Sequence, residues 1–292
     1  MHSGQIQKLE CALYVVATPI GNLRDISLRA LDVLASADVI AAEDTRNTGH
    51  LLTHYEIAAN RLMSLHQHNE RAAAEKVIAR LAQGQSVALV SDAGTPAVSD
   101  PGALLVAEVR AAGYRVIPIP GATAALAAMS ASGLPDPHFL FYGFLPNKSA
   151  ARCSALHNLS TLPYTLIFYE APHRIVECVA DLHKVLGDER QIVFAREITK
   201  MFESIHQCPL ADATAWLNSD PNNQRGEFVL LVSGAIVQQE GLDAEAERVL
   251  VVLLKELPLK QAVQLAVQIT GTGRNELYDH ALQIKEGGIA LE

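Results

Sequence analysis

Residues 87–102 read VALVSDAGTPAVSDPG and join a short apolar run to a polar loop that is rich in glycine and proline. The four apolar residues at 87–90 are typical of a buried strand in a parallel sheet, although periodicity alone also permits a buried stretch of helix. Gly94 and Pro96 then prevent a regular element from continuing. In α/β proteins, ligands bind at the carboxyl ends of such strands. The loop therefore suits a ligand site and a plain turn equally well.

The same alternation recurs about five times in the first 120 residues. Expected strands lie at 13–17, 38–42, 62–65, 87–90 and 115–119, with helices between them. Strands that alternate with helices predict a doubly wound parallel sheet. A second set of strands is expected at 138–143, 164–169, 191–196 and 228–233, where short connections allow mixed strand directions. The fold class is therefore α/β, with one domain at 11–125, a second at 126–236 and a helical tail at 241–292.

The tail carries three amphipathic segments and no further strand signal. Residues 258–283 have the spacing of a helix-turn-helix, but a helical tail that packs on a domain or a partner subunit explains the pattern as well. We favour the helical tail, because the segment has an acidic balance of charge and helix-turn-helix modules that bind nucleic acid are usually basic.

Composition limits the classes of function. Apolar residues make up 49% of the chain and aromatic residues 5%, which favours helices on a parallel sheet over a β-sandwich. The net charge of −9 argues against a general nucleic-acid binder, but it allows a local basic cleft. Four scattered cysteines without a CxxC pair, together with the absence of a signal peptide or a long apolar run, predict a cytoplasmic protein with no membrane contact.

Two charged clusters follow predicted strands directly. Residues 43–46 read EDTR and residues 170–174 read EAPHR, and each combines a carboxylate with a guanidinium. Such a group can deprotonate a hydroxyl or hold a phosphate, but it can equally be an ordinary surface ion pair. His66 and His68 stand two residues apart without a third ligand at metal spacing, so no metal site is predicted. Neither a GxxxxGK[ST] nor a GxGxxG motif is present.

With these loops, the chain resembles the tetrapyrrole-methylase-like (class III) family of S-adenosylmethionine-dependent methyltransferases. The matching segments are LYVVATPIGNLRDISLRALDVLASADVIAAEDTRNT, SDAGTPAVSDPG, IPGATAALAAMSASGLP, FYGFLPNK, FYEAPHRI, AREITKMFE and GEFVLLVSG. Each segment is weak alone, but seven in this order are specific, and they extend over roughly residues 11–283. Their combination is similar to a branch that methylates a cytidine 2′-hydroxyl in 16S ribosomal RNA. The resemblance implies two α/β domains with the methyl donor between them, a homodimer, and the small ribosomal subunit as substrate.

The resemblance also implies site residues. The donor-binding positions that match are Gly94, Thr95, Pro96, Val98, Ser99, Thr123, Ala124, Tyr169 and Glu227. Thr95 stands where porphyrin-methylating relatives have the acidic residue of a Gly-Asp-Pro loop, so no role of a charge is carried over. The first loop reads TPIGN instead of GxGPGD, which favours RNA over a tetrapyrrole.

A ribose hydroxyl reacts only when a base accepts its proton. The candidates for that base are Glu170, His173, Asp44 and Glu43, and the candidates for phosphate contact are Arg24, Arg46, Arg174, Arg196 and Lys200. Two alternatives to RNA methylation remain. The chain could methylate a tetrapyrrole or another small molecule, or it could be a non-catalytic RNA-binding protein that has kept the donor fold.

Overall fold

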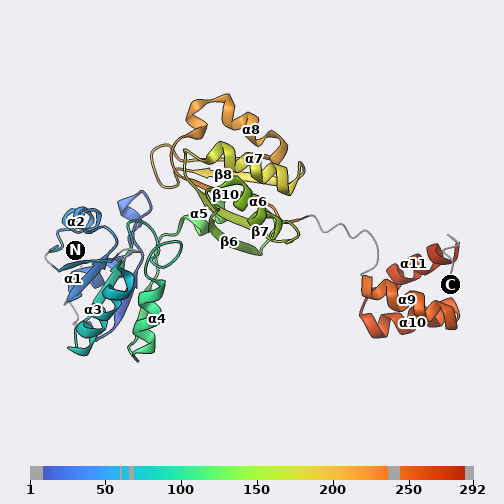
Figure 1. The fold of residues 1–292 in the computed structure, drawn as a ribbon, viewed down its shortest axis with the longest axis horizontal. Helices are drawn as coiled ribbons and strands as arrows, with labels where there is room; N and C mark the ends of the chain where they lie inside the picture. Colours follow the sequence, from blue (N-terminus) through green and yellow to red (C-terminus); the bar gives the residue numbers. More distant parts are fainter. Residues whose placement is uncertain (1–8, 60, 66–68, 236–243, 287–292) are drawn as a thin grey trace. The chain divides into compact units, whose positions relative to one another are not determined.

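The computed structural model describes residues 9–59, 61–65, 69–235 and 244–286 of the chain (Figure 1). The described residues up to Ala235 form one compact unit, which contains two sheets, and the C-terminal helices form another. His66 and His68 lie outside the described residues.

The first sheet has the order β3-β2-β4-β1-β5, and all of its pairs are parallel. Its strands are β1 (Leu13–Val16), β2 (Val39–Ala42), β3 (Leu62–Ser64), β4 (Val87–Val90) and β5 (Val116–Ile119). Between them run α1 (Leu28–Ser36), α2 (Thr45–His54), α3 (Glu70–Ala82) and α4 (Ala103–Ala111). This arrangement confirms the predicted doubly wound parallel sheet.

Helices cover both faces of this sheet. Successive strand residues point to opposite sides, so each strand contributes to two cores. In β4, Ala88 and Val90 pack in the same core as residues of α1 and α2. Val87 and Leu89 pack in a second core with residues of α3 and α4. Strands β2 and β4 are therefore buried along their whole length and β1 nearly so, which explains why they read as continuous apolar runs, whereas the edge strands β3 and β5 are partly exposed.

The second sheet has the order β6-β7-β10-β8-β9 and mixes strand directions, as the sequence predicts. Only β6 and β7 are parallel, and the other pairs are antiparallel. Its strands are β6 (Phe139–Phe144), β7 (Thr165–Glu170), β8 (Gln191–Arg196), β9 (Ser204–Pro209) and β10 (Phe228–Val232). Its helices are α5 (Ala124–Ala131), α6 (Ser149–His157), α7 (Ile175–Leu186) and α8 (Leu210–Ser219).

The sequence did not predict β9 and α8. The strand reads SIHQCP and lies at the edge of the sheet, where only one side is paired and a continuous apolar run is not required. The helix follows without a loop, so no turn signal separates the two elements.

Helix α5 connects the two sheets. It follows β5 of the first sheet, but Ala125 and Ala128 pack on the second sheet against residues such as Ile167 and Val229. Consequently, the loop before α5 lies where the two sheets meet. The domain boundaries given above stay a prediction.

The C-terminal unit is a three-helix arrangement. It contains α9 (Ala244–Glu256), α10 (Leu259–Thr270) and α11 (Arg274–Glu286). Leu250, Val263 and Leu277 contribute to its core, one from each helix. Among the described helices, none has the length and apolar character to cross a membrane.

Candidate active site

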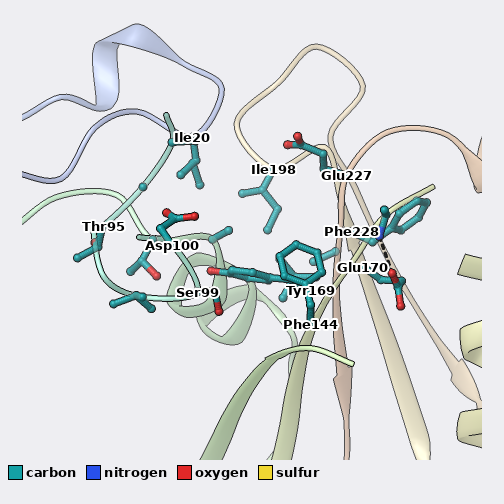
Figure 2. A pocket seen from close by; sticks show the side chains of 18 of the residues that line it. Ile20, Thr95, Ser99, Asp100, Phe144, Tyr169, Glu170, Ile198, Glu227 and Phe228 are labelled. Carbon is teal, nitrogen blue, oxygen red and sulfur yellow. Dashed lines mark hydrogen bonds between the residues drawn. The ribbon is translucent and has the colours of Figure 1, made fainter. Parts of the chain in front are cut away.

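A cavity of about 360 Å³ lies between the carboxyl ends of the first sheet and one end of the second sheet (Figure 2). From the first half of the unit, the loops after β1, β4 and β5 line it. From the second half come the ends of β6, β7 and β10 and the connection between β8 and β9. The loop within residues 87–102 therefore contributes to the wall of a cavity.

The loop after β4 is held in an unusual backbone conformation. Ala97 and Ser99 have φ angles of 65° and 62°. Residues other than glycine and asparagine seldom adopt this backbone region. Two contacts fix the loop at its ends. Gly94 forms an antiparallel bridge with Thr18 of the first loop, with N–O distances of 2.8 and 3.1 Å. At the other end, the Glu70 carboxylate accepts hydrogen bonds from the backbone N–H groups of Gly102 and Leu104, both at 2.9 Å.

Two glycines let the halves of the unit approach each other around the cavity. A Cβ atom on Gly143, in β6, would lie 2.5 Å from the Ser99 Oγ atom. A Cβ atom on Gly21, in the first loop, would lie 2.5 Å from Lys200 Cγ and 2.8 Å from Thr199 Oγ1. Larger residues at either position would separate the loops that line the cavity.

Nearly all of the predicted donor-binding residues come together here. The cavity is lined by Gly94, Thr95, Val98, Ser99, Thr123, Ala124, Tyr169 and Glu227, whereas Pro96 does not line it. Thr95 Oγ1 donates a hydrogen bond to the Ala122 carbonyl at 3.3 Å, and the Tyr169 hydroxyl accepts one from Ala125 N–H at 3.3 Å. Burial raises the pKa of Tyr169, so its hydroxyl stays protonated at neutral pH. That these residues bind a donor stays a prediction.

Neither candidate base of the second half, Glu170 or His173, is placed to accept a proton readily inside the cavity. Glu170 lines the cavity, but its side chain is 0% exposed and forms an ion pair with Arg174, with Oε1 and Nε 3.1 Å apart. Glu170 also accepts a hydrogen bond from Ala171 N–H. His173 is exposed and does not line the cavity.

The candidate bases of the first half lie outside the lining. Asp44 caps α2 and binds Arg46 at 2.7 Å, and this contact lowers the pKa of Asp44 to about 2. A carboxylate with so low a pKa is a weak base. Burial and the nearby Asp92 carboxylate raise the pKa of Glu43, whose side chain accepts a hydrogen bond from Asp92 N–H at 3.4 Å.

Asp92 lines a second hollow of about 410 Å³, which the loops after β1 and β4 form together with α2. Its carboxylate accepts hydrogen bonds from Asn47 Nδ2 at 2.9 Å and from Asp44 N–H at 3.1 Å. The hollow also contains His50 and His54. The residues that the structure describes include no group of three or more His, Cys, Asp or Glu side chains placed to hold a metal ion.

The candidate phosphate ligands are dispersed. Arg24 is exposed, and the Arg46 side chain is 84% exposed despite its pairing with Asp44. Arg196 binds Ser204 and the Asn222 carbonyl, and Lys200 binds Glu197 and Glu227 at the rim of the cavity.

Arg174 is directed inward. Its guanidinium donates hydrogen bonds to Asn147 and to the Leu145 carbonyl, in addition to the pairing with Glu170. Its contact with phosphate, like those of the other four basic residues, stays a prediction.

Sequence reasoning missed Asp100, which lines the cavity directly after Ser99. Figure 2 shows its carboxylate pointing into the cavity, between Ile20 and the Tyr169 ring. The available signal was an acidic residue in the same glycine- and proline-rich loop as Gly94 and Thr95. Phe144 and Ile198, which add apolar wall, were missed as well.

Two family models match the chain. Residues 12–214 match the model of the Tetrapyrrole (Corrin/Porphyrin) Methylases, and residues 240–285 match that of the RsmI C-terminal HTH domain. The second match favours the helix-turn-helix interpretation of the C-terminal helices over the packed helical tail that their acidic charge favours.

Relatives named "Ribosomal RNA small subunit methyltransferase I" match almost the whole chain. The relative from Escherichia coli O157:H7 is 52% identical over 93% of this chain and 94% of its own length. The relative from Pseudomonas aeruginosa is 54% identical over 93% of this chain and 96% of its own length.

Solved structures share the fold at low identity. The methyltransferase CobJ has a TM-score of 0.57 and 23% identity over 79% of this chain and 97% of its own. Diphthine synthase has a TM-score of 0.58 and 17% identity over 76% of this chain and 89% of its own. Because the family model covers more than half of the sequence and relatives at about 50% identity cover nearly all of it, the chain belongs to the tetrapyrrole methylase family of S-adenosylmethionine-dependent methyltransferases.

Proposed function

We propose that this chain transfers a methyl group from S-adenosylmethionine to the ribose 2′-hydroxyl of a cytidine in 16S ribosomal RNA. The observation that carries the proposal is the similarity to relatives named ribosomal RNA small subunit methyltransferase I, at about half identity over more than nine tenths of both chains. The site adds support, since Thr95 replaces the acidic residue of the porphyrin-methylating loop and lines the cavity.

The cavity suits the proposed donor in size and chemistry. Its volume of about 360 Å³ lies within the usual range for small-molecule sites of roughly 300–1,000 Å³. Ile20, Val98 and Tyr169 offer apolar and aromatic surface to an adenosine group. S-adenosylmethionine supplies a methyl group on a positively charged sulfur.

The residues of the chain would act mainly by position. In-line displacement at a methyl carbon depends on alignment, and a fixed geometry can contribute several kcal/mol, roughly 7–11 in favourable cases. The bridge between Thr18 and Gly94 and the close approach of Gly143 to Ser99 keep the lining loops in place before any ligand binds. Such preorganisation favours transfer without a large rearrangement of the backbone.

The net charge of −9 bears on the form of the substrate. Naked RNA is bound mostly through phosphates and therefore favours a basic surface. We infer that the assembled small ribosomal subunit, which offers shape as well as phosphate, is the substrate. We also propose that the chain acts as a homodimer in the cytoplasm.

The test is transfer of labelled methyl from S-adenosylmethionine to small ribosomal subunits that lack the modification. Label in a cytidine ribose is the expected result, and subunits that already carry the modification are the control. Label in porphyrinogen without RNA would favour the small-molecule alternative. Binding of the donor without transfer to either substrate would favour a non-catalytic RNA-binding protein.

A further inference from the structure

The cavity contains three carboxylates, and two of them are already engaged. Glu170 is fully buried against Arg174. Glu227 lies 2.7 Å from Lys200 Nζ at the rim, with a side chain that is mostly exposed. The third carboxylate is Asp100, which forms no ion pair with any residue in the described part of the chain.

The backbone holds Asp100 in position. It follows Ser99, whose positive φ angle turns the chain, and precedes the Gly102 N–H that Glu70 binds at 2.9 Å. Its side-chain hydrogen bond partner is Ser91, at the end of β4. Figure 2 shows that the carboxylate oxygens face the interior of the cavity. A small-molecule donor and an acceptor hydroxyl that meet in this cavity would both lie near it.

The surroundings of Asp100 are unusual for an aspartate. Burial, and after it the charges of Glu43 and Asp92, raise its pKa to about 6 against the opposing effect of the Ser91 hydrogen bond. On the opposite wall, Tyr169 is neutral, and Lys200 and Glu227 offset each other. A carboxylate with a pKa of about 6 is ionised at neutral pH and is a stronger base than a solvated aspartate.

We propose that Asp100 accepts the proton of the acceptor hydroxyl during methyl transfer. The inference rests on the proposed function. The acceptor oxygen forms a bond to the methyl carbon as the carbon–sulfur bond breaks, and the electron pair of that bond stays on sulfur. The hydroxyl proton passes to the Asp100 carboxylate and then to water. Charge and atoms balance, because a cationic sulfonium becomes a neutral thioether and one proton is released.

The experiment compares wild type, Asp100→Asn and a control, Asp32→Asn, which changes an exposed aspartate on α1 away from the cavity. Methyl transfer to unmodified small ribosomal subunits is measured from pH 5 to 9 at saturating donor. Calorimetry with S-adenosylmethionine measures donor affinity independently of turnover. Wild type and the control should lose activity below about pH 6, as the carboxylate becomes protonated.

Asp100→Asn should lower kcat by about 10²- to 10⁴-fold and change donor affinity by no more than about threefold. The loss of activity near pH 6 should also disappear from the residual rate. An unchanged kcat with a large loss of donor affinity would overturn the inference, because Asp100 would then only hold the donor. If wild type fails to methylate these subunits, the proposed function fails. If wild type and Asp100→Asn are equally active, only this inference fails.

A second variant keeps the proposal testable if Asp100→Asn does not fold. Glu43→Gln removes a negative charge that raises the pKa of Asp100, without touching the cavity lining. The acidic limb of the pH–rate profile should therefore move to lower pH. A limb that stays in place would show that another group titrates and would overturn the inference.

Discussion

The two charged clusters, EDTR after β2 and EAPHR at the end of β7, look alike in the sequence but differ in the folded protein. Asp44 and Arg46 pair at the surface, and the Arg46 side chain is 84% exposed. Glu170 and Arg174 pair inside the protein, with side chains 0% and 16% exposed. Burial, and not the residue types, separates the two pairs.

This difference decides what each cluster can do. Surface ion pairs contribute little to stability, because water and salt screen them. A buried pair cannot lose one partner without leaving an uncompensated charge. The EAPHR cluster therefore has a structural part at the edge of the cavity, while Glu43 of the EDTR cluster acts electrostatically on the nearby loop that carries Asp100.

The largest expected effect comes from breaking the buried pair. Arg174→Ala should lower the free energy of unfolding by about 3–5 kcal/mol, since Glu170 would stay buried without its partner. The matched change Arg46→Ala should have a far smaller effect, because its guanidinium is solvated. Urea denaturation of both variants measures the comparison. Similar losses would contradict the structural role of the inner pair.

The sequence sufficed to predict the α/β class and the parallel first sheet, although not β9 and α8, because short apolar runs followed by glycine and proline leave few alternatives. It also located most of the cavity, since parallel strands end at one edge of a sheet. It did not reveal which carboxylate faces the cavity. That depends on the positive φ angles of Ala97 and Ser99, and neither residue type announces such a conformation. The inward direction of Arg174, which pairs with Glu170, likewise depends on residues distant in sequence, because its guanidinium binds Asn147 and the Leu145 carbonyl.

A medium effect is expected where the two halves meet. Gly143 has a φ angle of 82°, and Gly143→Ala would add a Cβ atom 2.5 Å from Ser99 Oγ. The backbone strain should cost about 1–3 kcal/mol of stability. Displacement of Ser99 should also weaken donor binding. The control is Gly187→Ala, at the end of α7, where φ is 86° and nothing lies within 4 Å of the added atom.

Both glycine variants should lose stability in thermal melts, but only Gly143→Ala should lose affinity for S-adenosylmethionine in calorimetry. Equal affinity in the two variants would mean that the contact between β6 and the loop after β4 does not shape the cavity.

The smallest expected effect is a gain in stability from Asp100→Asn, opposite in sign to the loss from Arg174→Ala. The pKa of Asp100 is raised to about 6 in the folded protein, so the folded state holds this proton more tightly than the unfolded state does. Wild-type stability therefore falls as pH rises from about 4 to about 6 and is then level with respect to this group. The asparagine variant lacks that loss. Its advantage should be absent near pH 4 and should reach about 1 kcal/mol above pH 6, after allowance for screening by solvent.

Thermal melts at pH 4, 6 and 8 measure this difference, with Asp32→Asn as the control that should follow wild type. A variant that is less stable than wild type at pH 8 but equal at pH 4 would contradict the assignment, because the ionised carboxylate would then be a stabilising partner. The expected pattern instead describes a charge that the fold holds at a cost, in the one cavity carboxylate that the described residues leave without a cationic partner. Asp100 and Glu170, on opposite walls of the same cavity, would thus differ in how their charge is held, because only Glu170 has a cationic partner, Arg174, among the described residues.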